Sequence, residues 1–341
     1  MSETYTIEET NNMHILIIGL GSMGKRRARL LRGLEPDTVL LGVDTAPQRR
    51  EQAESLGIRA FSSLTEALEA VRPDAALVCT APVTHHAIIH QLLEAGIPVF
   101  TELNLLDTGY AENTALAREK DVPLFLSSTM LYRKETQYMK QQVLSFRERT
   151  GKNVNYLYHI GQYLPDWHPW ETYQNFFVSD KRTGGVREIL GIDLPWLVDL
   201  FGDAECVHVE SCRLTDLEIA YPDTITFILR HSSGTIGTMV VDVTSPKAVR
   251  HFECFGEGLH LFWEGSPKEL YHYDPETKEN RYVDTYGVYE HDSRYSDNIV
   301  ENAYVDELAD FLSMLREGTT PRWSFEKDQK VIDLIGTIDT N

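Results

Sequence analysis

Residues 14–24, with the sequence HILIIGLGSMG, decide the fold of this chain. The run His14–Ile18 is continuously apolar, as expected for a strand that is buried on both faces of a sheet. It leads directly into a glycine-rich turn, and a helical pattern then extends from Met23 to Arg32. A strand, a glycine turn and a helix in this order predict the first unit of a doubly wound, parallel α/β sheet.

The turn has the pattern G-x-G-x-x-G. Gly19 permits the tight turn, Gly21 lets the backbone approach a pyrophosphate, and Gly24 lets the helix pack closely on the strand. The free N–H groups and the dipole of the helix then face the phosphates. We therefore expect a dinucleotide to be held by Gly19, Leu20, Gly21, Ser22, Met23 and Gly24.

Asp44 follows the next apolar run, Thr38–Val43, and lies twenty residues beyond Gly24. A carboxylate at this place accepts hydrogen bonds from both ribose hydroxyls of NAD and repels a 2′-phosphate. The cofactor expected is therefore NAD, while Arg49 and Arg50 keep NADP open. The alternative interpretation is an ordinary glycine turn followed by a surface aspartate.

The rest of the chain divides into two patterns. Strand-like runs at Ala75–Cys79, Ile97–Phe100 and Leu124–Leu126 alternate with helical segments, which predicts an NAD(P)-binding Rossmann domain over residues 13–128. Beyond it, strand patterns dominate, and residues 129–341 are predicted to form an α+β domain for substrate binding and oligomerisation, with a large, mostly antiparallel open sheet. The sequence does not decide whether the last helix packs on the first or on the second domain. Residues 1–12 are expected to be a disordered or extended tail.

The composition narrows the classes of partner. Lys and Arg number 32 against 52 Asp and Glu, a net charge of −20, which repels nucleic acid and anionic membrane surfaces. We expect no nucleic-acid partner and no membrane span, since no run of 18 apolar residues occurs. The four cysteines form no C-x-x-C, and the histidines lack metal-ligand spacing, so a cytoplasmic protein without a metal site is expected.

Two later segments carry a family resemblance. The fourth apolar run leads into CTAPVTH at residues 79–85, and the fifth leads into FTELN at residues 100–104. Together with the glycine turn, with Tyr132-Arg133 and with Gly184-Gly185 before a helix, the chain resembles the glucose–fructose oxidoreductase, inositol dehydrogenase and rhizopine catabolism (Gfo/Idh/MocA) family over most of its length. Members typically read T-P-x-x-x-H and E-K-P at these two places.

The resemblance implies an oxidoreductase that binds NAD(P) in its first domain and a sugar, cyclitol or related polyol at the domain junction. It also implies a homo-oligomer, a dimer or tetramer, formed through the open sheet. By position, Thr80, Pro82 and His85 line the nicotinamide side of the cofactor, and Glu102 lies near the nicotinamide ribose. The alternatives are a His85 that begins a helix without touching a ligand and a Glu102 that only supports its loop.

The chain departs from the family where proton transfer is expected. Hydride transfer to or from a carbinol needs a group that exchanges a proton with the substrate oxygen. The family's lysine position is Leu103, and its histidine position falls on Ile192 or Asp193. Asp193 and Glu188 are the replacements proposed on the same helix; the alternatives are a surface or capping carboxylate for Asp193 and pairing with Arg187 or Arg182 for Glu188.

The segment from Tyr163 to Trp170 is the second candidate region. Trp167 and Trp170 are expected to stack on a sugar, and His168 titrates near neutrality, so it is the third candidate for proton transfer. Tyr132 and Tyr163 are further candidates for contact with the substrate. The alternative is a small satellite core beneath a long loop.

Two functions are therefore compared. The first is an NAD(P)-dependent oxidoreductase that acts on a sugar, nucleotide sugar or cyclitol with a non-standard acid/base. The second is a catalytically silent, dinucleotide-binding regulatory protein of the same fold, which the loss of the family's lysine and histidine favours. A shared fold does not decide between them.

Overall fold

The computed structural model describes residues 12–168, 171–291 and 298–339. The predicted tail therefore lies outside the described residues except for Asn12, and Trp170 of the aromatic segment lies outside them too. In the described part of the chain, no helix is both long and apolar enough to cross a membrane.

The first part of the chain forms the predicted doubly wound sheet. Its six parallel strands have the order β3-β2-β1-β4-β5-β6. The strands are β1 (His14–Ile18), β2 (Val39–Val43), β3 (Arg59–Phe61), β4 (Ala75–Val78), β5 (Val99–Thr101) and β6 (Leu124–Leu126). The sequence did not predict β3, which has three residues, of which only Phe61 is buried.

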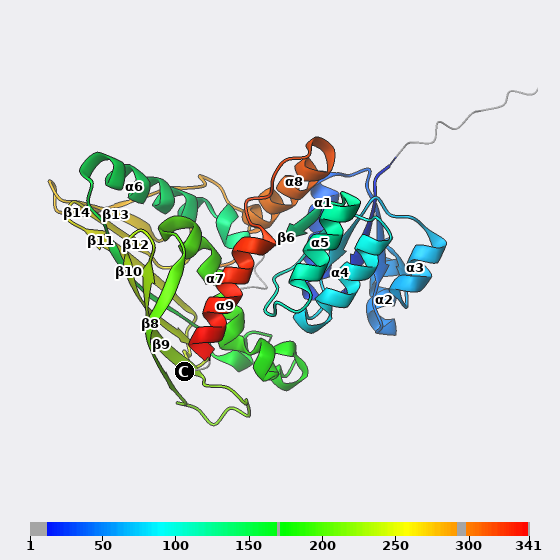
Figure 1. Ribbon diagram of the computed structural model, residues 1–341, viewed down its shortest axis with the longest axis horizontal. Helices are drawn as coiled ribbons and strands as arrows, with labels where there is room; N and C mark the ends of the chain where they lie inside the picture. The colour runs from blue at the N-terminus through cyan, green and yellow to red at the C-terminus, as the bar shows by residue number, and fades with distance from the viewer. Residues whose placement is uncertain (1–11, 169–170, 292–297, 340–341) are drawn as a thin grey trace, which may run out of the picture.

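Helices cover both faces of this sheet (Figure 1). They are α1 (Ser22–Leu34), α2 (Pro47–Ser55), α3 (Leu64–Ala70), α4 (His85–Glu94) and α5 (Tyr110–Lys120). At the start of α3, the side chain of Ser63 caps the helix. Ser63 Oγ accepts from the N–H of Glu66 at 3.1 Å, but the Glu66 carboxylate returns to Ser62 rather than to Ser63.

The second sheet has eight strands in the order β14-β13-β12-β11-β7-β10-β9-β8, and only the β7–β10 pair is parallel. Buried and exposed residues alternate along β9, as expected for a sheet with one covered face. The strands are β7 (Asn155–Gly161), β8 (Ala204–Cys212), β9 (Thr224–His231), β10 (Ile236–Asp242), β11 (Val249–Gly256), β12 (Leu259–Trp263), β13 (Leu270–Asp274) and β14 (Glu279–Tyr282). The predicted α/β fold with an open, mostly antiparallel sheet is confirmed, while β13 and β14 were not predicted.

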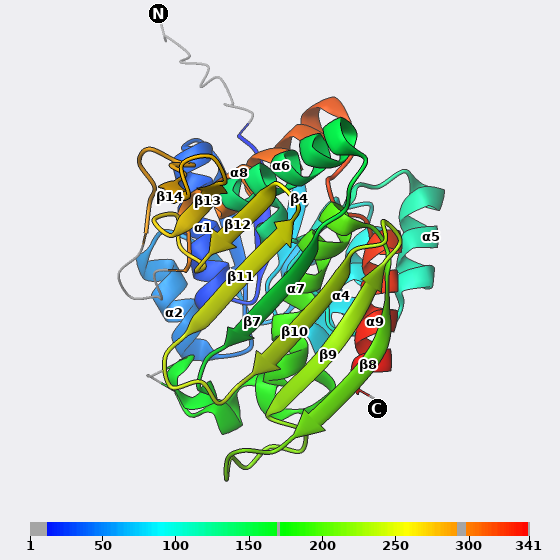
Figure 2. The same ribbon diagram turned by 90° about the vertical axis from the view of Figure 1, so that its left-hand side faces the viewer.

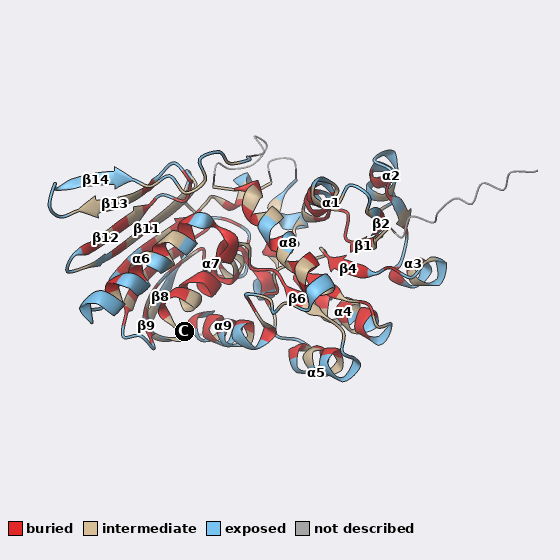
Figure 3. Cartoon of the chain, turned by 90° about the horizontal axis from the view of Figure 1, so that it is seen from above, coloured by how far each residue is buried: buried red, intermediate tan, exposed pale blue. Residues whose placement is uncertain are grey.

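One face of the second sheet carries helices and the other is open (Figures 1 and 2). The helices on this face are α6 (Lys134–Thr150), α7 (Gly185–Phe201) and α9 (Phe325–Asp339), and α7 is mostly buried (Figure 3). The remaining helix, α8 (Glu301–Glu317), packs elsewhere. α7 contains Pro195, which has no N–H to donate to the carbonyl of Gly191. The segments that connect these elements include the short 3₁₀ turns Thr129–Tyr132 and Leu164–Asp166.

The C-terminal helices join the two sheets. α8 lies beside α1 (Figure 1), and Phe311 packs its ring against Phe100 of β5 and Phe125 of β6. In α9, Asp328 accepts a hydrogen bond of 2.6 Å from Tyr110 of α5. One apolar cluster consequently runs without a break from one face of the first sheet to the covered face of the second. The domain boundary near residue 128 stays a prediction, and α8 packs on the first sheet although it follows the second in sequence.

Candidate active site

The glycine turn has the geometry that its pattern predicts. Gly19 has φ +93°, and a Cβ there would lie 2.7 Å from the Cys79 carbonyl oxygen. A Cβ on Gly24 would lie 1.9 Å from the Gly19 carbonyl oxygen, so both positions require glycine. At Gly21, which precedes α1, the nearest atom to such a Cβ is an Arg49 nitrogen at 3.7 Å. This open space above the start of a helix fits the pyrophosphate of a dinucleotide.

Asp44 is held at the end of β2 by the turn itself. One carboxylate oxygen accepts from the N–H of Leu20 at 2.8 Å, and the other accepts from the N–H of Ala46 at 2.9 Å. A carboxylate oxygen has lone pairs to spare after one such bond, so both remain able to accept from ribose hydroxyls. Arg49 lies 3.6 Å from the same carboxylate, while Arg50 bonds the carbonyls of Asp44 and Thr45. The predicted acid is therefore next to the glycine turn.

His85 links the loops that follow β4 and β5. One ring nitrogen lies 2.9 Å from the Thr80 carbonyl, and the other lies 2.6 Å from the side-chain amide of Asn104. Burial lowers the pKa of His85, which favours a neutral ring. Thr80 accepts a hydrogen bond from Thr84, and Pro82 is buried at the start of a 3₁₀ turn. A role of these residues toward nicotinamide stays a prediction; their visible contacts fix the two loops.

Glu102 belongs to a buried ion network that the sequence analysis missed. Its carboxylate lies 2.6 Å from Nε of Arg27, and Arg27 also lies 2.6 Å from the carboxylate of Glu307 on α8. Arg27 and Glu307 are fully buried. Glu307 further accepts from the Ser127 hydroxyl and from the backbone N–H of Ser128. The supporting role proposed for Glu102 is thus visible, and its proximity to the nicotinamide ribose stays a prediction.

The second network lies on α7, where the family has its histidine. Asp193 is fully buried and forms an ion pair with Arg250 of β11. The same carboxylate oxygen accepts from the Tyr158 hydroxyl at 2.6 Å and from the Trp196 indole at 3.0 Å. The alternative of a surface or capping carboxylate is wrong for Asp193. Its other oxygen is buried and has no hydrogen-bond partner among the described residues.

Glu188 differs from both networks because it has no cationic partner. Neither predicted pairing is present: Arg187 bonds the Leu105 carbonyl and Asp339, and Arg182 pairs with Asp180. One oxygen of Glu188 is buried and, within the described parts of the chain, accepts no hydrogen bond. Burial raises the pKa of Glu188 to about 8. A carboxyl of this kind can give or take a proton near neutrality.

Leu103 packs against α7. A Cβ placed on Gly191 would lie 3.3 Å from a methyl group of Leu103 and 2.7 Å from one of Leu105. The place at which the family has a lysine is therefore occupied by an apolar side chain next to the helix that carries Glu188 and Asp193.

The aromatic segment after β7 lies near the start of α7. The Trp167 ring lies 3.3 Å from the Cβ position of Gly185, and its indole N–H donates to the Gln162 carbonyl at 3.0 Å. Tyr163 is half-buried against the core. The His168 ring lies 4.3 Å from that of Phe176, and burial lowers the pKa of His168 while Glu171 opposes the shift. The segment packs as a satellite of the core, and contacts of these side chains with a substrate stay predictions.

Tyr132 lies at the junction with α8. Its hydroxyl donates to Asp310 at 2.6 Å, the Arg322 guanidinium lies over its ring, and the residue is 1% exposed. Burial raises the pKa of its phenol well above the usual range. These contacts hold the Tyr132 side chain against α8. They do not support its predicted contact with a substrate.

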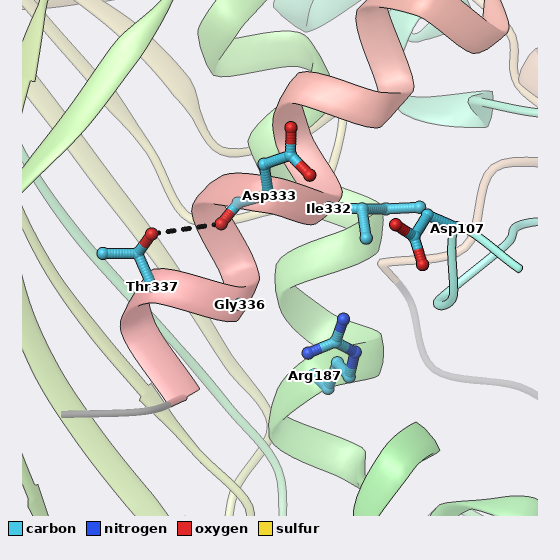
Figure 4. A pocket seen from close by; sticks show the side chains of 6 residues that line it. All are labelled: Asp107, Arg187, Ile332, Asp333, Gly336 and Thr337. Carbon is cyan, nitrogen blue, oxygen red and sulfur yellow. Dashed lines mark hydrogen bonds between the residues drawn. The ribbon is translucent and has the colours of Figure 1, made fainter. Parts of the chain in front are cut away.

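A separate depression of about 410 Å³ lies between α7, α9 and the loop after β5 (Figure 4). None of its lining residues was among the predicted site residues: Asp107, Arg187, Ile332, Asp333, Gly336 and Thr337. In Figure 4 the Thr337 hydroxyl points along the helix to the Asp333 carbonyl, a bond of 3.1 Å. Among residues 12–168, 171–291 and 298–339, no group of His, Cys, Asp and Glu side chains is arranged to hold a metal ion.

Comparison with known proteins agrees with this geometry. Residues 13–127 match the Gfo/Idh/MocA model, described as an oxidoreductase family with an NAD-binding Rossmann fold. A myo-inositol 2-dehydrogenase from Thermotoga maritima is 27% identical and covers 95% of this chain and 94% of its own. An oxidoreductase from Agrobacterium radiobacter, solved with NAD⁺, L-tartaric acid and magnesium, superposes with a TM-score of 0.77 at 14% identity, over 95% of this chain and 94% of that one.

A third match has the same fold. A putative NADPH-dependent oxidoreductase from Desulfitobacterium hafniense superposes with a TM-score of 0.80 at 12% identity, over 97% of this chain and 95% of that one. The family match covers the glycine turn, Asp44 and the loops that end in His85 and Glu102. Residues 13–127 are therefore similar to the NAD-binding Rossmann domain of the Gfo/Idh/MocA oxidoreductases.

Proposed function

We propose that this protein transfers hydride between NAD(H) and a CH–OH or C=O group of a sugar, nucleotide sugar or cyclitol. The observation that carries the proposal is the intact cofactor cradle, in which Gly19 and Gly24 admit no side chain and Asp44 is held beside the turn by the N–H of Leu20. The full-length similarity to a protein named myo-inositol 2-dehydrogenase supports a polyol as the substrate. NAD⁺, when bound, accepts the hydride; the chain supplies binding, orientation and proton exchange.

The residues expected to touch the cofactor remain those of the glycine turn, together with Asp44, Thr80, Pro82, His85 and Glu102. The carbonyl and amide contacts of His85 keep the loops after β4 and β5 at one edge of the sheet. In a doubly wound sheet, ligands bind at this carboxyl edge of the strands. Asp193, His168 and Glu188 remain the candidates for proton exchange, with Tyr163 and Trp167 as candidates for substrate contact.

The experiment has two stages. Nicotinamide fluorescence is followed as NADH and NADPH are added to the wild-type protein and to Asp44→Ala. The wild type is expected to bind NADH, and the variant to bind it more weakly. The protein is then mixed with NAD⁺ and, in turn, with myo-inositol, D-glucose, L-tartrate and UDP-N-acetylglucosamine as probes. The absorbance of the NADH formed measures turnover. Binding without turnover of any probe would contradict the enzyme and favour the silent, dinucleotide-binding regulatory protein.

The open face of the second sheet supports a homo-oligomer. Leu157 of β7, Val207 of β8 and Phe255 of β11 are exposed apolar residues on strands of this sheet, and no helix of Figure 2 covers its outer face. We infer that this face forms the contact between copies. Sedimentation velocity of the wild type and of Leu157→Glu tests it; a wild-type monomer would contradict it.

The four cysteines are unpaired, which fits the expected cytoplasmic setting.

A further inference from the structure

We propose that Glu188 is the catalytic acid/base of this enzyme: its carboxyl exchanges the proton with the substrate oxygen in place of the family's lysine and histidine. The inference rests on the proposed hydride transfer, because without a reacting carbinol there is no proton to exchange. It deepens that proposal by choosing one of its three candidates.

The position of Glu188 on α7 carries the first part of the argument. Residues three apart in a helix lie along one strip of its surface. Glu188 is three residues after Gly185, whose Cβ position lies 3.3 Å from the Trp167 ring. It is three residues before Gly191, whose Cβ position lies 3.3 Å from Leu103. Glu188 therefore lies on the strip of α7 that runs from the aromatic segment to the loop with Leu103.

Gly185 and Gly191 allow neighbouring segments to approach α7 closely. A Cβ on Gly191 would approach Leu105 to 2.7 Å, and one on Gly185 would approach Leu164 to 3.1 Å. Both neighbouring segments thus approach the helix closely on either side of Glu188. α7 has two ionisable side chains between these contacts: Arg187, which donates to the Leu105 carbonyl, and Glu188, which has no cationic partner among the described residues.

The hydrogen-bonding state of the candidates carries the second part. Both carboxyls have one buried oxygen without a partner in the described part of the chain, but the other oxygen of Asp193 is bound by Tyr158, Trp196 and Arg250, so this carboxylate is fixed in a structural ion pair. Within the same described residues, Glu188 has a buried oxygen with no partner, and the two arginines nearest to it in sequence, Arg187 and Arg182, bond other groups. An unsatisfied buried polar atom is rare in native proteins and requires a reason. A hydrogen bond between the Glu188 carboxyl and a substrate hydroxyl or carbonyl would be such a reason.

The surroundings of Glu188 set its protonation. The phenol of Tyr221 interacts electrostatically with it, and the other ionisable groups on elements packed against α7 have partners elsewhere or lie in the flanking loops. These groups are Tyr132, Tyr158, Asp180, Lys181, Arg182, Arg230, His231, Asp242, Arg250, Glu326, Lys327, Asp328, Lys330, Asp333 and Asp339, with Asp107 and His168 in the loops. Burial raises the pKa of Glu188 to about 8, so below that pH the carboxyl holds its proton.

The proton balance follows. In the reductive direction Glu188 donates its proton to the carbonyl oxygen while the carbonyl carbon receives hydride, which gives an alcohol and a carboxylate. In the oxidative direction the Glu188 carboxylate accepts the hydroxyl proton while the carbon gives up hydride. Reduction is therefore expected to be faster below about pH 8, and oxidation is expected to rise through that pH.

The test uses the full-length protein and the probe among myo-inositol, D-glucose, L-tartrate and UDP-N-acetylglucosamine that the wild type oxidises. Glu188→Gln keeps the shape of the side chain and removes its proton exchange, so we expect kcat to fall by about 100-fold or more. The affinity for NADH is expected to stay within about threefold of the wild-type value, because the substitution leaves the residues expected to bind the cofactor unchanged. The rise of the oxidation rate near pH 8 is expected to disappear. Glu148→Gln, an exposed change of the same kind on α6, is the matched control.

The outcomes separate the inference from the function on which it rests. Turnover by Glu188→Gln within about tenfold of wild type, or a retained pH dependence, overturns the role of Glu188 in an enzyme that still works. No wild-type turnover with any probe, despite NADH binding, removes the proposed function and the inference with it. If Glu188→Gln fails to fold, Glu188→Asp replaces it: the shorter carboxyl is expected to keep part of kcat and to shift the pH dependence, and an unchanged profile overturns the inference.

Discussion

The glycine turn and the start of α7 are both built around buried carboxylates, but they treat them in opposite ways. At the cofactor end, both oxygens of Asp44 accept backbone N–H groups, and Glu102 is paired with the buried Arg27. On α7, Asp193 and Glu188 each keep one buried oxygen without a partner in the described residues. In the first region the protein supplies a donor to each of these carboxylates, whereas in the second one oxygen of each carboxylate has none among the described residues. The difference indicates that cofactor binding depends on backbone shape and that the chemistry depends on a few side chains.

The largest expected effect is at Gly24. Gly24→Ala places a methyl group 1.9 Å from the Gly19 carbonyl, so strand and helix must separate. We expect NADH affinity to fall by at least about 100-fold, which corresponds to about 2.7 kcal/mol. Fluorescence titration measures the affinity, and the melting temperature measures the fold.

Gly21→Ala is the control for this change. Its methyl group meets no protein atom closer than 3.7 Å, so the melting temperature is expected to stay close to that of the wild type. The methyl group nevertheless occupies the approach of the pyrophosphate, so NADH binding is expected to weaken. If Gly21→Ala binds NADH as tightly as the wild type, the proposed position of the pyrophosphate is wrong.

The next effect concerns the buried pair at the cofactor end. Arg27→Met leaves the carboxylates of Glu102 and Glu307 without their cation, and we expect a loss of about 3–5 kcal/mol in the free energy of unfolding. Urea denaturation measures it. Arg316→Met, which breaks an exposed pair with Glu35, is expected to cost at most about 1 kcal/mol. Equal costs for the two variants would mean that the Arg27 network contributes no more than a surface contact.

Arg27 and Arg250 show which contacts cannot be predicted from the sequence. The glycine turn and Asp44 could be predicted because backbone constraints within a single βαβ unit dictate their residue types. The pairs Arg27–Glu307 and Asp193–Arg250 join residues far apart in sequence, so only the folded chain brings them together. A signal for Arg27 was present, because it lies on the apolar face of α1 with Leu30 and Leu31.

Strand prediction failed for a related reason. β3 and β14 are short and mostly exposed, so neither a buried run nor a clear alternation marks them. The α/β class and the open sheet could be predicted because they depend on several periodic segments. The acid/base group could not be, because the sequence offers three candidates, two carboxyls on one helix and a histidine in an aromatic loop, and only the fold shows which partners each one has.

The unpaired Glu188 predicts an unusual dependence of stability on pH. The folded state binds the proton of Glu188 up to a pKa of about 8, whereas the ordinary pKa of a glutamate is 4.5, so the folded state holds more protons than the unfolded state between these values. The free energy of unfolding therefore falls as pH rises from about 4.5 to 8, by at most about 5 kcal/mol at 1.36 kcal/mol for each pH unit. Asp328, with a pKa raised by burial to about 6, adds a decline of the same sign at lower pH.

Glu188→Gln is expected to remove most of the decline between pH 6 and 8 while leaving the part below about 6 that belongs to Asp328. Urea denaturation at a series of pH values measures it. A wild-type protein whose stability is flat or rises over this range would show that the carboxyl is already ionised, and the contrast between the two regions would lose its electrostatic basis.

The smallest expected effect concerns Arg49 and the choice between NADH and NADPH. Arg49 is half exposed, lies 3.6 Å from Asp44, and is near the place expected for the adenine ribose, while Arg50 is bonded to backbone carbonyls. A 2′-phosphate would meet the repulsion of Asp44 and the attraction of Arg49, and an exposed ion pair contributes only about 0.2–1 kcal/mol. Arg49→Gln is therefore expected to weaken NADPH binding by up to about fivefold and to leave NADH binding within about twofold. If the variant weakens both cofactors equally in parallel titrations, Arg49 acts by holding Asp44 in place, and selection between NAD and NADP at this site depends on the carboxylate alone.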